Sequence, residues 1–206
     1  MGKHSDSVDH AVLSRIVGKG KGWVFTPSDF KDLGTRTAVA LALMRHKRQN
    51  VIRQLARGLY DYPDQHSVIG VLSPHPDKVA KALSARDASR VQATGAYAAN
   101  ILGLSDQVPA RTMFLTDGRS RRVRIGRQEI ILHHTTPRNM ATAGTASGLV
   151  IQALRWIGRR HVDDQICALL AKLLPDADKR KLIKDARHAP AWVAEIMRRV
   201  SATRKD

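Results

Sequence analysis

The sequence predicts an α+β protein in which a winged helix-turn-helix precedes a small α+β module and a helical C-terminal tail. Three observations indicate this class. Apolar residues recur at helical spacing near both ends of the chain, β-branched runs with glycine turns occupy residues 51–62 and 111–135, and only helical patterns follow Pro137. We therefore expect a winged helix-turn-helix DNA-binding domain over residues 1–63, an α+β module over 64–137 and a helical extension over 138–206.

The winged helix-turn-helix is centred on the long helix expected over Thr35–Asn50. A first helix is predicted over residues 7–17, with Ser5, Asp6 or Ser7 as its cap, and a short strand over Trp23–Phe25. Residues 27–33 can form a short second helix. Gly34 then supplies the tight turn that a helix-turn-helix requires.

The long helix combines a narrow apolar stripe with a basic face, and a hairpin follows it. Residues 51–55 and 59–62 read as strands joined by a short glycine loop, which is the arrangement of a wing. A single helix of this kind is often only an amphipathic helix with a solvated basic face, but the order of elements favours DNA binding. The expected DNA contacts are Thr35, Arg36, Thr37, Arg45, Lys47, Arg48, Arg53 and Arg57. Arg36 is the candidate for reading guanine.

The charge of the chain points to a polyanionic partner. Lys and Arg number 35 against 18 Asp and Glu, which gives a formal net charge of +17 and a pI near 10.9. No apolar stretch reaches the length of a membrane span, and Asp6 and Asp9 stand where a signal peptide would have its apolar core. We expect a cytoplasmic protein that does not bind membranes.

Two sequence runs carry a resemblance to a known family. The first is VFTPSDFKDLGTRTAVALAL followed by RGLYDYP, and the second is TGAYAANILGLSDQVPARTMFLTDG. Residues 7–137 resemble the winged-helix antitoxins of the AbiEi type and a related DUF6088-like domain of unknown function. The resemblance implies a transcriptional repressor that binds its own operator DNA and counteracts a nucleotidyltransferase-type toxin encoded beside it. It leaves open whether antitoxin and toxin touch. Because operators are commonly repeated, we expect two protomers per site, as in a homodimer on DNA.

The middle module is expected to contain helices over residues 77–84 and 88–102 and strands over 111–116, 121–125 and 129–135. In the second strand arginines alternate with apolar residues, which predicts one basic and one buried face. The cluster Arg119, Arg121, Arg122, Arg124 and Arg127 is either a solubilising face or a second polyanion contact, to DNA beside the operator or to the RNA substrate of a partner toxin.

The sequence offers no catalytic, metal or cofactor site that we would predict. His133 and His134 are adjacent in a strand and point to opposite faces, and Cys167 lies in an apolar run typical of a core. The acidic residues are scattered and no nucleophile stands near a base, so we do not expect an enzyme. The rival functions are an RNA-binding protein that uses the basic hairpin 111–135, and a partner-binding protein without sequence-specific DNA recognition. An aromatic content of 4% argues against base stacking as the main device of an RNA reader.

The C-terminal tail is predicted to form helices over residues 147–159, 165–174, 179–186 and 192–200, with Pro175 and Pro190 between the later ones. Such a tail can cover the middle module, form a dimer or bind the toxin. Packing on its own chain is the simplest of these expectations.

Overall fold

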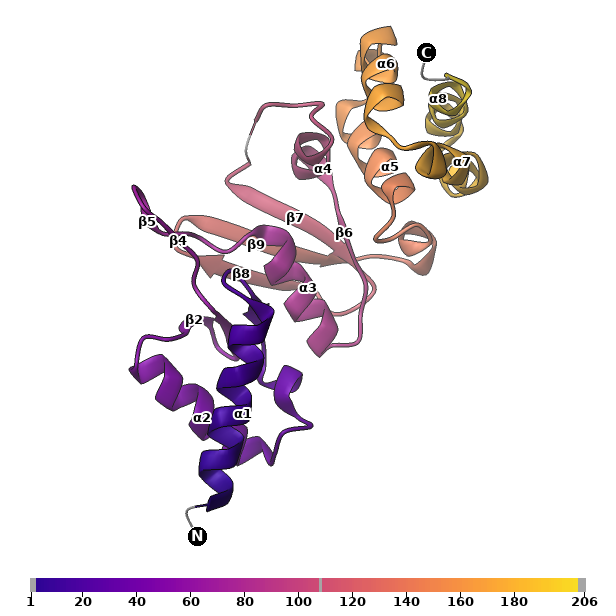
Figure 1. Ribbon diagram of the computed structural model, residues 1–206. Coiled ribbons are helices and arrows are strands. Elements are labelled where there is room, and N and C mark those ends of the chain that lie inside the picture. The colour runs from indigo at the N-terminus through magenta and orange to yellow at the C-terminus, as the bar shows by residue number, and fades with distance from the viewer. Residues whose placement is uncertain (1–2, 108, 204–206) are drawn as a thin grey trace. The chain divides into compact units, whose positions relative to one another are not determined.

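The computed structural model describes residues 3–107 and 109–203, with side chains from residue 8 onward, and confirms the α+β class (Figure 1). The chain forms two compact units. One comprises the residues up to Ala88 together with Val123–Ile130, and the other comprises Ser89–Arg122 and the residues from Ile131 onward. These units follow boundaries other than residues 63 and 137, so the three-part division stays a prediction.

The first unit contains the elements of a winged helix-turn-helix in their expected order. The elements are α1 (Lys3–Lys19), β1 (Val24–Phe25), the 3-10 helix η1 (Pro27–Phe30), α2 (Arg36–Arg48), β2 (Arg53–Ala56) and β3 (Leu59–Asp61). The three strands form an antiparallel sheet in the order β1-β3-β2. The cap predicted among Ser5, Asp6 and Ser7 concerns side chains outside the described part.

A small aromatic core holds this unit together. The rings of Phe25 and Phe30 are both fully buried and meet edge to face with centroids 5.4 Å apart, and Trp23 contacts both rings. The apolar stripes of α1 and α2 pack onto these rings. The buried members of the core are Val12, Ile16, Phe25, Phe30, Val39, Ala42, Leu43 and Ile52.

The turn between η1 and α2 depends on Gly34 for a reason other than the predicted one. Gly34 does not adopt the left-handed conformation that favours glycine. A Cβ atom at this position would instead lie 2.9 Å from the Cγ2 atom of Val8 on α1. The glycine is therefore needed because α1 approaches the turn closely, and not because of its backbone freedom.

An ion pair joins α1 to the segment after η1. The guanidinium of Arg15 donates to both carboxylate oxygens of Asp32 at 2.7 Å and to the carbonyl oxygen of Asp29 at 2.7 Å. The hydrogen bond from Arg15 is the largest cause that lowers the pKa of Asp32, to about 2 from an ordinary value of 3.8. The pair is therefore expected to stabilise the fold only while Asp32 is ionised.

Acid titration tests this ion pair. A carboxylate whose pKa is lower in the folded state stabilises the fold above the unfolded pKa, and this contribution disappears as the pH falls through the folded pKa. We expect the wild-type protein to lose stability between about pH 4 and pH 2, and Asp32→Asn to lose less over the same window. The measurement is thermal unfolding by circular dichroism across these pH values. Identical pH profiles for the two proteins would contradict the role given to Arg15.

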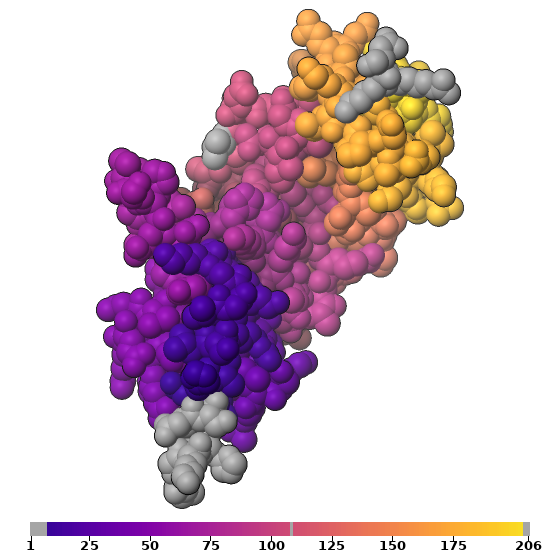
Figure 2. Space-filling view, viewed as in Figure 1, coloured from indigo at the N-terminus to yellow at the C-terminus, as the bar shows by residue number. Residues whose placement is uncertain are grey.

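The passage after the wing is a protruding hairpin. Strands β4 (Gln65–His66) and β5 (Gly70–Val71) pair antiparallel, and the tip residues Val68 and Ile69 are 83% and 70% exposed. Figure 2 shows the hairpin standing off the surface. Helix α3 (Pro76–Arg86) follows and extends the predicted helix 77–84 by one residue at its start and two at its end.

The second sheet has four strands where three were predicted. Its strands are β6 (Val91–Ala93), β7 (Arg111–Thr116), β8 (Arg121–Ile125) and β9 (Gln128–His134), in the order β6-β7-β9-β8. The predicted helix 88–102 is wrong over its first half, since β6 pairs with β7 there and only α4 (Gly95–Ile101) is helical. Gly95 has a φ of +64°, which separates the strand from the helix.

The C-terminal region is helical, as predicted. After the 3-10 helix η2 (Pro137–Met140) come α5 (Ala146–Ile157), η3 (Arg159–His161), α6 (Asp164–Leu173), α7 (Asp176–Asp185), η4 (Ala186–His188) and α8 (Ala191–Ala202). Their apolar faces share one core with α4, in which Ala98, Leu154, Leu170 and Met197 are fully buried. Figure 1 shows α5 to α8 gathered together, so the tail packs on its own chain as expected.

Candidate nucleic-acid interface

Helix α2 presents an exposed face that is available to a ligand. Its buried face consists of Val39, Ala42, Leu43 and His46, and the intervening residues are exposed. The Thr35 hydroxyl accepts a hydrogen bond from the Ala38 N–H at 3.2 Å and so caps the helix. Its last turn carries Arg45, His46, Lys47 and Arg48. Cationic side chains at this position interact favourably with the negative end of the helix dipole.

Among the predicted contact residues on α2 and its cap, Thr35, Arg45 and Lys47 have partners within the protein. Thr35 is engaged as the cap. Arg45 lies 3.5 Å from an Asp9 carboxylate oxygen on α1, and Lys47 donates to the Gln54 side chain on β2 at 2.7 Å. These bonds hold α2 against its neighbours, and the Arg45 side chain remains 45% exposed. The two cations therefore combine a structural contact with access to solvent.

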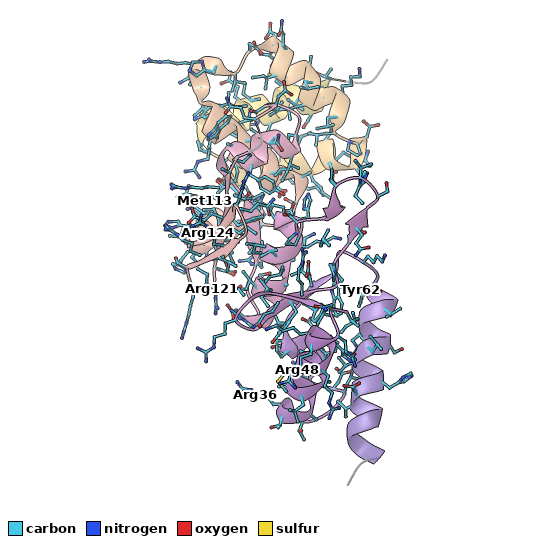
Figure 3. The ribbon with its side chains drawn as sticks, turned by 90° about the vertical axis from the view of Figure 1, so that its left-hand side faces the viewer. Arg36, Arg48, Tyr62, Met113, Arg121 and Arg124 are labelled. Atoms are coloured by element: carbon cyan, nitrogen blue, oxygen red, sulfur yellow. The ribbon has the colours of Figure 1, made fainter. Side chains whose placement is uncertain are left out.

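Three arginines of the winged helix remain uncommitted. Within residues 8–107 and 109–203, no hydrogen bond or ion pair engages the guanidinium of Arg36, Arg48 or Arg57, and all three side chains are exposed. Arg36 and Arg48 are the first and last residues of α2, and Figure 3 shows Arg36 projecting on the side away from α1. Thr37, the next predicted contact, is exposed one residue further along. This part of the predicted site is accessible from solvent.

Arg57 stands at the tip of the wing. Strands β2 and β3 pair with Gln54 opposite Tyr60 and Ala56 opposite Leu59, which leaves Arg57 and Gly58 as the turn. Gly58 has a φ of +70°, as a tight hairpin turn requires. The turn places an exposed cation at the end of the hairpin, and its contact with DNA stays a prediction.

Arg53 has a different environment from the one that its sequence position suggested. Its Nε donates to Asp61 Oδ1 at 3.0 Å, and its Nη2 donates to Asp61 Oδ2 at 2.5 Å and to the Leu72 carbonyl oxygen at 2.9 Å. Asp61 is only 1% exposed. The hydrogen bond to Asp61 is the main cause that raises the pKa of Arg53 above its ordinary value. Arg53 thus supports the base of the wing, and its contact with DNA stays a prediction.

A buried histidine connects α1 with α2. His46 is 2% exposed, and its Nε2 lies 3.4 Å from the Asp9 carbonyl oxygen and 3.7 Å from an Asp9 carboxylate oxygen. The same carboxylate contacts Arg45. Asp9 is therefore the residue of α1 that fixes the C-terminal half of α2, a role that the sequence pattern did not indicate.

The second arginine cluster follows the predicted strand pattern. Arg122 and Arg124 are exposed on one face of β8, whereas Ile125 on the other face is 9% exposed. Arg119 lies in the turn before β8 and Arg127 in the turn after it, both exposed, and Arg121 is half-buried. Figure 3 labels Arg121 and Arg124 on this strand. The exposed members make a basic sheet face, and its role as a polyanion contact stays a prediction.

His133, His134 and Cys167 are the residues that the sequence singled out for metal or thiol chemistry. In the described part of the chain no three His, Cys, Asp or Glu side chains gather in the manner of a metal site. His134 places its Nδ1 2.8 Å from the Gly118 carbonyl oxygen, and both His133 and His134 are exposed. Burial is the main cause that raises the pKa of the Cys167 thiol, which keeps it protonated at neutral pH.

Sequence reasoning missed two exposed apolar residues on α2. Leu41 and Met44 are 44% and 39% exposed, and they lie on the outward face near Thr37 and Arg48. The signal was present in the sequence, because residues 37, 41, 44 and 48 are spaced by three or four positions and form a second stripe opposite the buried one.

Comparison with known proteins places the chain in a family. Every helix within residues 3–107 and 109–203 is too short or too polar to traverse a lipid bilayer. The comparison with curated proteins gave no match. A family model for DUF6088, a family of unknown function, matches residues 11–182, which include both the winged helix and most of the helical region. The chain therefore belongs to the DUF6088 family.

Proposed function

We propose that this protein is a sequence-specific DNA-binding repressor that inserts α2 into the major groove of its own operator. The observation that carries the proposal is the exposed face of α2, which ends in the uncommitted Arg36 and Arg48 and is followed by a wing with Arg57 at its tip. The net charge of +17 agrees with a nucleic-acid partner.

Each accessible residue has a distinct part in this proposal. Arg36 and Thr37, in the first turn of α2, approach base edges, and the fork of the Arg36 guanidinium suits the O6 and N7 acceptors of guanine. Arg48 and Arg57 bind phosphates and set affinity and orientation rather than sequence. Arg45 and Lys47 add charge near the same backbone.

The antitoxin part of the proposal rests on the resemblance to AbiEi-type antitoxins. We propose a binding protein, not an enzyme, that counteracts a nucleotidyltransferase-type toxin encoded beside it. The test is co-expression of the chain with the neighbouring nucleotidyltransferase. Restored growth of the host would support the proposal, and growth arrest at equal expression of both proteins would contradict it.

Binding to the upstream DNA tests the repressor part. The full chain is titrated against a duplex of its own upstream sequence and against a scrambled duplex of equal length, at two salt concentrations. Preference for the upstream duplex that persists at high salt supports sequence-specific recognition, because phosphate contacts weaken steeply with salt. Equal binding that collapses with salt would contradict it. The stoichiometry measured at saturation tests the expected two protomers per site.

Arg36→Ala should separate base reading from charge. We expect a loss of roughly 1 to 3 kcal/mol on the upstream duplex and little change on the scrambled duplex, since only the former offers the guanine contact. Arg180→Ala, an exposed arginine of α7, is the matched control and should leave both affinities nearly unchanged. Equal losses on both duplexes for Arg36→Ala would assign Arg36 to a phosphate instead.

The basic face of β8 suits a polyanion, and we consider RNA as a second candidate partner. Arg122 and Arg124 project from the same face of the strand, a spacing suited to a phosphate backbone. A variant with both arginines replaced by alanine should lose affinity for a structured RNA while keeping its preference for upstream DNA. Unchanged RNA binding in this variant would remove the second candidate.

A further inference from the structure

The outward face of α2 has an apolar centre. Thr37, Ala40, Leu41 and Met44 are all exposed and lie within about two turns of the helix, opposite the buried Val39, Leu43 and His46. We name these four residues the methyl strip. Leu41 and Met44 are 44% and 39% exposed, although the same helix also has a buried face.

Cations surround the methyl strip. At 100° per residue, Arg36 and Lys47 flank it on one side and Arg45 on the other, while Arg48 follows at its C-terminal end. Lys47 and Arg45 are held near these positions by Gln54 and Asp9. An apolar protein surface seated on the strip would bring these charges close to apolar atoms without partners, which is costly. A polyanion with an apolar group at its centre would match both the surrounding cations, which we call the cationic rim, and the methyl strip.

The major groove of DNA offers such a feature. Thymine alone among the four bases presents a methyl group there, and alanine, threonine and other apolar side chains contact it. Leu41 and Met44 have no strong hydrogen-bond donor, so they cannot read the edges of guanine, adenine or cytosine in the way that Arg36 can. The phosphates on either side of the groove then face the cationic rim.

We propose that the methyl strip of α2 recognises thymine C5-methyl groups, so that the operator carries thymines opposite Ala40, Leu41 and Met44 next to the base pair read by Arg36. The inference rests on the proposed function, because it presupposes that α2 enters the major groove. It adds the base class that the helix selects and the residues that select it.

Replacing thymine by deoxyuridine tests the inference, because this change removes the methyl group and leaves Watson–Crick pairing intact. The wild-type chain is titrated against two upstream duplexes of identical sequence, one with thymine and one with deoxyuridine at every thymine position. We expect affinity to fall about fourfold per contacted methyl group, which is the effect of one buried CH₂ group. The same substitution in the scrambled duplex should change little. Undiminished binding to the deoxyuridine duplex would overturn the inference.

A double variant, Leu41→Ala with Met44→Ala, connects the effect to the strip. It should bind the thymine duplex more weakly than the wild type and lose most of its preference for thymine over deoxyuridine, with Ala40 retaining a small part of that preference. Leu169→Ala, an exposed leucine of α6, is the matched control and should retain full sensitivity to the methyl group. A double variant as sensitive to deoxyuridine as the wild type would also overturn the inference. The titration with deoxyuridine uses only the wild-type chain, so it tests the inference even if the double variant does not fold.

The outcomes separate the inference from the proposed function. If the upstream and scrambled thymine duplexes bind equally, the repressor proposal fails. If the upstream preference persists undiminished with deoxyuridine, the repressor proposal stands and the methyl strip has another role. Sedimentation of the free protein adds a third outcome: a dimer that becomes a monomer in the double variant would overturn the inference and assign the strip to a second copy of this chain.

Discussion

Arg53→Ala is expected to lower the free energy of unfolding by about 3 kcal/mol. The substitution leaves the Asp61 carboxylate, which is 1% exposed, without the two guanidinium hydrogen bonds that now compensate its charge. It also removes the donor to the Leu72 carbonyl oxygen. Breaking a buried ion pair on one side typically costs about 3 to 5 kcal/mol, and the lower end applies because the Arg53 side chain is 35% exposed. Urea-induced unfolding measures the change.

Two control variants test whether the loss of stability comes from the buried charge of Asp61. In Arg90→Ala the lost pair with Asp117 lies at the surface, with side chains 54% and 28% exposed, so a loss below about 1 kcal/mol is expected. Adding Asp61→Asn to Arg53→Ala removes the uncompensated charge and should restore part of the stability. A loss for Arg53→Ala as small as that for Arg90→Ala would show that solvent reaches Asp61.

Arg53 also shows why a charge pattern predicts an interface only in part. Every arginine of the winged helix contributes to the net charge, yet Arg53 is neutralised by Asp61 whereas Arg57, four residues later, is not. The hairpin register places Arg53 directly opposite Asp61. Opposite charges at directly paired positions of two antiparallel strands predict an ion pair. It could have been used once the two-residue turn at Arg57 and Gly58 was recognised.

Periodicity predicted the elements whose local preference and tertiary role agree. The C-terminal helices were placed within a few residues, because their apolar side chains face one core. The strands 111–116 and 121–125 match β7 and β8, because exposed residues alternate with less exposed ones along most of each strand. The helix predicted over residues 88–102 is wrong in its first half, because the alanines of this segment favour a helix locally. Pairing of Val91–Ala93 with β7 and the left-handed Gly95 override that preference. Neither effect can be read from the segment alone.

The methyl strip illustrates a second limit. Reading apolar residues as core is correct for Val39 and Leu43 on α2, but Leu41 and Met44 on the same helix are exposed. Only the packing of α1 and the small sheet decides which stripe is buried. A helix with two apolar stripes and one covering surface leaves the other stripe exposed, so the sequence pattern alone does not say which stripe belongs to the core.

Gly148→Ala is expected to destabilise the protein by about 3 kcal/mol, although alanine normally strengthens a helix. Gly148 lies in the first turn of α5, and its N–H donates to the capping hydroxyl of Thr145 at 3.1 Å. A Cβ atom there would lie 2.2 Å from the Thr142 carbonyl oxygen and 2.5 Å from the Gln92 side-chain oxygen. The Thr142 carbonyl oxygen belongs to the backbone, so it cannot move aside by a change of side-chain rotamer. Displacement of Gln92 would also break its hydrogen bond from the Gly144 N–H, which is 2.9 Å long.

Gly18→Ala provides the opposite case within the same chain. Gly18 is helical in α1, and nothing lies within 4 Å of the position of its missing Cβ atom. Its replacement should leave stability unchanged or raise it by up to about 1 kcal/mol, since alanine reduces the conformational entropy lost on folding. Thermal unfolding of the two variants therefore isolates steric contact from helix preference. If Gly148→Ala matched Gly18→Ala, the turn at Thr142 would have to shift freely, and the hydrogen bonds of Gln92 and Thr145 would not be needed to begin α5.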